Sequence, residues 1–270
     1  MKETARRLLK QMDNPDDPEL RRLQSDAKEH VGEVAHAAGL FPDKHAIRRL
    51  SYTYYYDWET DDPDFMLLLQ DPGNLHKRHL EELQPENPLE GGCTRREQVH
   101  IYRQFAKSWL TGRNADFSEQ FFGTFDDHGL INLGAGWKDY ITTERMFQDV
   151  YLGDVVKYRV DGFGRSAERK SYAKFLEEEI EALDPDLLIT FGSNAWDALR
   201  RETGPSAVRN SAASPGKMLD IHGTLHSISD PIDTFVLPLS HMSGQVWWRF
   251  PPSDYIGRLD SALQLWGEVR

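Results

Sequence analysis

The stretch Leu69-Gln70-Asp71-Pro72-Gly73 joins the end of a short apolar run to a turn, and this junction decides the fold. The chain contains four such runs, each short, continuous and apolar. Continuous rather than alternating hydrophobicity is typical of strands that are buried on both faces of a parallel sheet. The four runs are Phe65 to Leu69, Val150 to Val156, Leu187 to Phe191 and Thr234 to Leu239.

Helical patterns separate these runs. In the stretch Tyr172 to Leu183, apolar side chains repeat along one helical face, and Glu177, Glu178 and Glu181 lie on the other. A last amphipathic helix is predicted over Tyr255 to Trp266. The alternation of strands and helices predicts an α/β fold, namely a three-layer sandwich with a central four-stranded, mostly parallel sheet.

The first part of the chain has a different pattern. Residues 1–60 are predicted to form a helical N-terminal extension, in which Ser25 caps a helix that ends near Gly39. Residues 61–270 are then the α/β domain. Roughly eighty residues separate the first two predicted strands, far more than one crossover helix needs. We therefore expect an insertion over about 85–136 that covers one side of the site.

The composition describes a globular chain with an acidic surface. It has 44 acidic and 32 basic side chains, giving a net charge of −12. Such a charge argues against a nucleic-acid partner, because phosphate binding is chiefly electrostatic, but a local basic groove is compatible with it. The longest uninterrupted apolar stretch is too short to span a bilayer, and Met1 to Asp16 lacks the apolar core of a secretory signal. We expect a cytoplasmic protein with no membrane association.

Cofactor chemistry is restricted by the cysteine count. A single cysteine, Cys93, cannot form an intrachain disulfide, nor an all-cysteine metal or iron–sulfur site. His222 and His226 are four residues apart, which would suit two metal ligands on a helix, but Gly223 between them favours a loop. We therefore expect neither a metal nor another cofactor.

Polar residues directly after the apolar runs are the candidate site, because ligands of open parallel sheets bind at the carboxyl ends of strands. Asp71 and His241 follow the first and the fourth run, Asp154 lies in the second, and Ser193 and Asn194 follow the third. A carboxylate and an imidazole on one rim suit hydrolysis of a glycosidic bond. The carboxylate stabilises an oxocarbenium-like sugar and orients water, and the imidazole N–H stabilises the departing base. Taken alone, an Asp-Pro-Gly sequence is more often a turn than a catalytic site, and a histidine after a strand is more often structural.

Taken in order, these segments resemble the uracil-DNA glycosylases. Leu69 to Gly73 is similar to motif one, which is Gly-Gln-Asp-Pro-Tyr, Gly-Glu-Ala-Pro-Gly or Gly-x-Asn-Pro-Gly in different branches. Leu239 to Ser243 is similar to motif two, His-Pro-Ser. Asp149 to Arg159 and Leu183 to Ala195 resemble two segments of the branch that carries an iron–sulfur cluster. The resemblance covers residues 65–250.

The resemblance implies a DNA glycosylase that flips its target base out of the stack. It implies that Asp71 activates water or stabilises the sugar cation, and that His241 donates to O2 of the base. Backbone N–H groups near a helix start would bind phosphates, and an aromatic wedge would unstack bases. The residues implied to bind the base are Gln70, Gly73, Asp154 and Phe125. Those implied to contact DNA are Ser193, Asn194, Ser243, Gly244, Trp247 and Arg249.

Several positions depart from the family pattern. Asp154 stands where the family has an asparagine whose amide donates to O4 of uracil, and a carboxylate has no donor unless it is protonated. Leu69 replaces the first glycine of motif one, and Met242 replaces the proline of motif two. Tyr158 and Tyr172 stand where the iron–sulfur branch has cysteines, so no cluster is expected.

Three functions are compatible with the sequence. The first is a monofunctional DNA glycosylase that acts without a metal on uracil or another deaminated or modified base. The second is a non-catalytic protein with the same fold that binds nucleic acid or a protein partner, which Asp154, Leu69 and the acidic surface favour. The third is an enzyme acting on free nucleosides or nucleotides. Packing in the core is the alternative to base contact for Phe125, and packing on the last helix is the alternative for Trp247.

Overall fold

The computed structural model describes residues 2–39, 64–70, 95–158, 165–208, 218–229, 232–241 and 251–270. The chain divides into two compact units. The first consists of Met1–Asp61, Asp71–Ser108 and Leu152–Leu183. The second consists of Asp62–Gln70, Trp109–Tyr151 and Asp184–Arg270. Each unit is described separately below.

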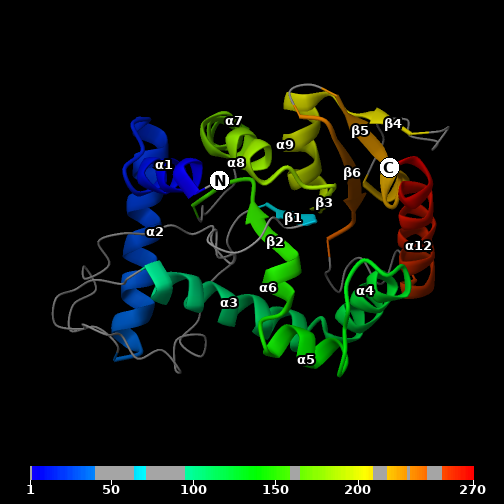
Figure 1. Ribbon diagram of the computed structural model, residues 1–270. Helices are drawn as coiled ribbons and strands as arrows, with labels where there is room; N and C mark the ends of the chain where they lie inside the picture. The colour runs from blue at the N-terminus through cyan, green and yellow to red at the C-terminus, as the bar shows by residue number, and fades with distance from the viewer. Residues whose placement is uncertain are drawn as a thin grey trace. The chain divides into compact units, whose positions relative to one another are not determined.

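A sheet of six strands is the framework of the fold, with the order β2-β1-β3-β6-β5-β4 (Figure 1). β3 pairs in parallel with β1 and β6, whereas β5 pairs antiparallel with β4 and β6. The strands are β1 (Phe65–Leu69), β2 (Val150–Asp154), β3 (Leu187–Phe191), β4 (Ser206–Ala207), β5 (His226–Ile228) and β6 (Thr234–Leu239).

The predicted α/β fold class is confirmed, and each of the four apolar runs contains a strand: β1, β2, β3 and β6. The predicted number of strands was too small by the two strands β4 and β5, which continue the sheet beyond β6. These strands contain two and three residues. Segments this short have no measurable hydrophobic period, so a prediction from sequence patterns overlooks them.

The core of the second unit lies between the sheet and two helices, α4 (Ala115–Asp127) and α12 (Pro252–Val269). The parallel register places Ile189 between Leu67 and Leu237. The ring of Phe65 lies 5.4 Å from that of Phe125 and 5.9 Å from that of Trp266, both nearly edge-on. α12 contains the predicted last helix, and its apolar face packs on β6 and α4.

Shorter helices complete the second unit. α9 (Ser193–Thr203) contacts β3, and α10 (Met218–Ile221) contacts β6. α5 (Trp137–Thr142) and α6 (Met146–Asp149) follow α4 in the chain. α3 (Arg95–Thr111) begins in the first unit, and its last residues belong to the second. Of these helices, α9 and α10 contact the strands β3 and β6, whose carboxyl ends carry candidate site residues.

The first unit contains α1 (Lys2–Asp13), α2 (Pro18–Ala37), α7 (Arg165–Ser171) and α8 (Glu177–Leu183). The prediction that Ser25 caps a helix is wrong, because Ser25 lies inside α2. The cap is Asp17, whose carboxylate accepts the N–H groups of Glu19 and Leu20. An acceptor at this position satisfies helix donors that have no intrahelical partner. The helix predicted from Tyr172 begins as one π-helical segment, η3 (Tyr172–Leu176).

A buried polar network supports the segment after β2 in the first unit. Lys157 and Glu179 form an ion pair, and neither side chain is exposed. The Ser171 hydroxyl donates to the carbonyl of Val155 at 2.8 Å and accepts the N–H of Lys157 at 3.1 Å. Buried charges persist in proteins when they are paired and hydrogen-bonded. The network therefore connects this segment to the end of α7 and to α8.

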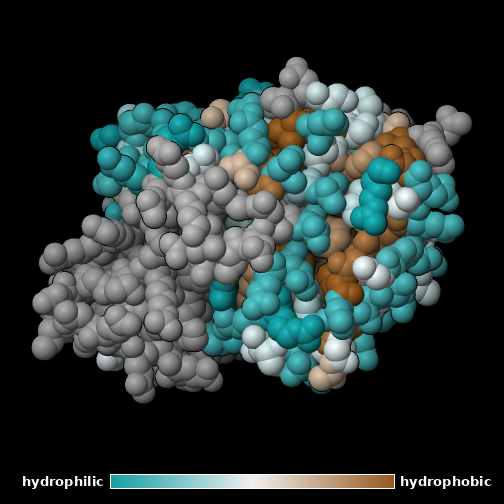
Figure 2. Space-filling model, viewed as in Figure 1, coloured by the Kyte–Doolittle hydropathy of each residue, from teal (hydrophilic) through white to brown (hydrophobic). Residues whose placement is uncertain are grey.

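The face of the molecule in Figure 2 shows how polar and apolar residues are distributed on the described surface. On the face shown in Figure 2, hydrophilic residues predominate and hydrophobic ones appear as separate patches between them. Among the described residues, no helix combines the length and the apolar composition needed to cross a membrane.

Candidate functional site

Three neighbouring strands of the second unit have their carboxyl ends at the same end of the sheet, which we call the carboxyl edge. β1, β3 and β6 are parallel neighbours, so their carboxyl ends lie on the same side. The N–H of Gly192, directly after β3, donates to the carbonyl of Leu239 at 2.8 Å. The amide of Asn194 donates to the side-chain oxygen of Gln70 at 2.6 Å. The described parts of motifs one and two therefore meet the start of α9 at this edge.

His241 is the imidazole at this edge. A Cβ built on Gly192 would lie 3.3 Å from the His241 Cβ, and Gly192 has a φ of +90° that L side chains rarely adopt. Only glycine combines this backbone conformation with so close an approach. The ring of Trp109, near the end of α3, lies 6.2 Å from the imidazole ring. His241 thus lies between a backbone and an indole, and its side chain keeps access to solvent.

The protonation state of His241 follows from these surroundings. Desolvation by the adjacent protein lowers the pKa of His241, although part of the side chain remains exposed. The imidazole is therefore neutral at neutral pH. A neutral imidazole carries one N–H donor and one acceptor nitrogen. The N–H of this neutral ring can donate a hydrogen bond to an oxygen that gains negative charge.

The start of α9 offers backbone donors beside this imidazole. The side chains of Ser193 and Asn194 are exposed in the first turn. The first N–H groups of a helix have no intrahelical acceptor and carry the positive end of the helix dipole. A helix N-terminus of this kind can bind an anion such as a phosphate.

Two buried side chains hold the backbone before His241. The N–H of Ser240 donates to Nδ1 of His222 at 3.0 Å. The Tyr255 hydroxyl donates to the carbonyl of Ser240 at 2.7 Å. All three residues are at most 2% exposed. The sequence pattern indicated His222 only as a possible metal ligand, and Gly223 directly after it was the signal for a tight turn.

Two other candidate residues are buried, and six lie outside the described residues. Phe125 is 2% exposed in the core, against Phe65 and Phe121. Asp154 ends β2 in the first unit and is fully buried. The candidates outside the described residues are Asp71, Gly73, Ser243, Gly244, Trp247 and Arg249.

The two histidines considered as metal ligands have other contacts. Gly223, with a φ of +73°, forms a turn after His222, and His226 begins β5. Nε2 of His226 lies 2.8 Å from the Thr224 hydroxyl, and its ring packs on Trp196. Within the described ranges, no group of three His, Cys, Asp or Glu side chains could hold a metal ion.

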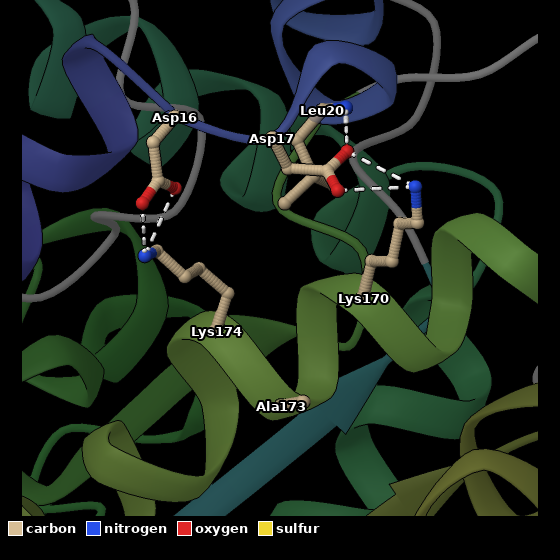
Figure 3. Close-up of a pocket in the computed structure, with 6 residues that line it drawn as sticks. All are labelled: Asp16, Asp17, Leu20, Lys170, Ala173 and Lys174. Atoms are coloured by element: carbon tan, nitrogen blue, oxygen red, sulfur yellow. Dashed lines mark hydrogen bonds and ion pairs between the residues drawn. The ribbon is translucent and has the colours of Figure 1, made fainter.

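A hollow in the first unit has a different chemistry (Figure 3). Lys174 pairs with Asp16 at 2.9 Å, and Lys170 pairs with Asp17 and Glu19 at 3.0 Å. The ion pairs join the α1–α2 connection to α7 and η3. Because the lysine charges are compensated, this hollow is a joint between helices rather than an anion site. Its lining consists of Asp16, Asp17, Leu20, Lys170, Ala173 and Lys174.

Comparison with known protein families identifies a superfamily. The sequence model of the uracil DNA glycosylase superfamily matches residues 94–262, more than half of the chain. This span includes β3, α9, β6 and His241, whereas motif one lies before it. A search of curated proteins finds no match.

Proposed function

Because the chain belongs to the uracil DNA glycosylase superfamily, we propose that it is a DNA base-excision glycosylase that hydrolyses the N-glycosidic bond of uracil or another deaminated or modified base. Family membership supports a glycosylase-type function. The observation that carries the finer proposal is the accessible, neutral imidazole of His241 at the carboxyl edge of the sheet. It lies on the same edge as Gln70, the residue that precedes Asp71 in the chain.

The proposed reaction needs no residue beyond those of this edge and the following turn. As the C1′–N bond breaks, its electron pair moves to the base, and the N–H of His241 donates to the base oxygen that gains charge. The carboxylate of Asp71 stabilises the cationic sugar and orients a water molecule, whose oxygen bonds to C1′. The proton lost by this water passes to the carboxylate or to solvent.

DNA contacts in this proposal come from backbone and aromatic groups. Ser193 and Asn194 present helix-start N–H groups that suit phosphates, and Ser243 and Gly244 would do the same after motif two. Trp247 would unstack bases and Arg249 would bind phosphate, while Gln70 and Gly73 would shape the base pocket. Local donors of this kind are compatible with a net charge of −12, because phosphate contacts depend on nearby groups.

A cleavage assay tests the proposal. Oligonucleotides that each carry one deaminated or modified base are incubated with the protein and then treated with alkali, which breaks the strand at an abasic site. Asp71→Asn and His241→Ala should each lower the single-turnover rate by about a hundredfold or more. Asp116→Asn, an exposed carboxylate on α4, is the matched control and should retain the wild-type rate. Wild-type rates in both site variants would eliminate these assignments.

A non-catalytic role is the second candidate, and Asp154 favours it. This residue is fully buried at the end of β2 and stands where the family has an asparagine. In an active pocket with altered selectivity, Asp154→Asn should raise uracil cleavage about ten- to a hundredfold, because a mismatched buried hydrogen-bond partner costs about 1–3 kcal/mol. In a non-catalytic protein, neither the wild type nor this variant should cleave any lesion, and DNA binding should persist.

A further inference from the structure

We propose that His222 and Tyr255 are positioning residues that fix the direction of His241 by holding both peptide groups of Ser240. The inference rests on the proposed function, in which His241 acts on the departing base. Neither residue touches the accessible face of the site. Both are fully buried, and each acts through one hydrogen bond to the backbone of Ser240.

The two hydrogen bonds control consecutive peptide planes. The N–H of Ser240 belongs to the peptide that joins it to Leu239, and this group donates to Nδ1 of His222 at 3.0 Å. The carbonyl of Ser240 belongs to the peptide that joins it to His241, and this group accepts the Tyr255 hydroxyl at 2.7 Å. Because each peptide is planar, fixing both planes fixes φ and ψ of Ser240. It therefore also fixes the Cα of His241.

His222 is itself held in one orientation. Its ring centre lies 4.0 Å from that of Tyr255, and Nε2 lies 3.4 Å from the Tyr255 carbonyl. Nδ1 must be unprotonated to accept the N–H of Ser240, so Nε2 carries the proton and donates to this carbonyl. Burial lowers the pKa of His222 to about 4, which keeps the acceptor nitrogen available at neutral pH.

The turn that carries His222 is fixed to the same elements. The N–H of Gly223 donates to the carbonyl of Pro238 on β6 at 2.9 Å. The guanidinium of Arg258, on α12, donates to the carbonyl of Leu219 at 3.2 Å. We call the two hydrogen bonds from His222 and Tyr255 to Ser240 the clamp, and this clamp connects β6, α10 and α12. Gly192 and Trp109, which are not part of the clamp, contact the side chain of His241.

His226 provides a matched control. It is also buried, at 4% exposed, and burial also lowers its pKa to about 4. Its ring nitrogen lies close to the Thr224 hydroxyl and its ring packs on Trp196, and neither of these contacts involves Ser240. A substitution of His226 removes a buried imidazole from the same unit. It therefore reproduces the loss of packing without removing the acceptor for Ser240.

The first experiment measures single-turnover cleavage of a uracil-containing oligonucleotide by the full chain. His222→Ala should lower the rate about ten- to a hundredfold with little change in the dissociation constant for DNA, because small displacements of a reacting group have effects of this size. Tyr255→Phe removes only the hydroxyl and should lower the rate in the same way. His222→Asn, whose amide oxygen can accept the Ser240 N–H, should recover part of the rate. His226→Ala should stay within about twofold of the wild type once compared at equal folded fraction.

A second readout separates this inference from the proposed function. Amide hydrogen exchange of Ser240 should accelerate at least tenfold in His222→Ala and remain at the wild-type level in His226→Ala, whether or not the protein cleaves DNA. A wild type that cleaves no lesion, together with this exchange pattern, would contradict the proposed function and leave the clamp supported. If the wild type is active, equal cleavage rates in His222→Ala and His226→Ala would overturn the clamp, and unchanged Ser240 exchange would overturn it in either case. If His222→Ala does not fold, Tyr255→Phe decides, because an unchanged cleavage rate in this variant of an active protein would overturn the clamp.

Discussion

Gly223→Ala should destabilise the second unit far more than a similar change at another glycine with positive φ. A Cβ at residue 223 would lie 2.6 Å from the Cβ of Arg258 and 3.1 Å from its backbone. Real Cβ atoms essentially never come within 3.0 Å of another side-chain atom, and the Cβ of Arg258 is bonded directly to the backbone of α12, so α12 or the turn must move. Gly204, which ends α9 with a φ of +56°, has no atom within 4 Å of such a Cβ. Alanine would therefore be strained by the positive φ at both positions, but only at residue 223 would its Cβ also collide with neighbouring atoms.

The expected loss in the free energy of unfolding has two contributions, one from the backbone conformation and one from overpacking. Placing alanine in the left-handed region costs about 1–2 kcal/mol, and the reduced freedom of the unfolded chain returns about 0.4–1 kcal/mol. Gly204→Ala should thus cost about 1 kcal/mol. Gly223→Ala has the same contribution plus about 1–3 kcal/mol for overpacking against Arg258. The free energy of unfolding should fall by about 2–4 kcal/mol in this variant, a large fraction of a typical stability.

Urea unfolding at pH 7, followed by tryptophan fluorescence, measures both variants under the same conditions. We expect the lower midpoint for Gly223→Ala, with an unchanged slope in both. Because the turn carries His222, this variant should also accelerate amide exchange at Ser240. Equal losses of stability in the two variants would refute the reasoning, since they would show that the close approach to Arg258 does not constrain residue 223.

Three further predictions concern buried groups. Burial lowers the pKa values of His222 and His226 from 6.5 to about 4, so the folded state binds fewer protons than the unfolded state. The contribution of these histidines to the free energy of unfolding should be fully present above pH 6.5. It should fall as the pH drops towards 4, by at most about 3 kcal/mol for each histidine. Urea unfolding between pH 7 and 4 measures this loss of stability. If stability fell as steeply with pH in His226→Gln as in the wild type, the assignment to His226 would be contradicted. Glu179→Gln leaves the buried charge of Lys157 unpaired and should cost about 3–5 kcal/mol in the same assay. A loss below about 1 kcal/mol, the range of exposed pairs, would argue against that burial. Tyr158→Phe removes the hydroxyl that donates to the last turn of α1 at 2.7 Å, so amide exchange in α1 should accelerate, and unchanged protection would exclude this anchoring role.

The strands at the centre of the sheet could be predicted because their own residues carry the pattern. β3 and β6 match the predicted runs Leu187 to Phe191 and Thr234 to Leu239 at both ends. Their residues are buried on both faces, so uninterrupted hydrophobicity is required there. The start of α2 was mispredicted because Ser25 was taken as the cap, although the helix begins seven residues earlier, at Pro18. The observed hydrogen bonds to the carboxylate of Asp17 identify the actual cap.

The candidate site was predictable only in part, because its two kinds of residue obey different constraints. Residues proposed to perform chemistry must have a particular side chain directly after a strand, so His241 could be proposed from its position in the sequence. Residues that orient it need only reach the right backbone atom in the folded chain. Trp109, His222 and Tyr255 meet at Ser240 and His241 from three separate parts of the sequence, and none follows a predicted core strand. Such contacts are set by the tertiary structure, since a buried polar group is stabilised by whichever partner the packing brings within hydrogen-bond distance. The orientation of His241 is therefore a property of the folded core, while its identity is a property of motif two.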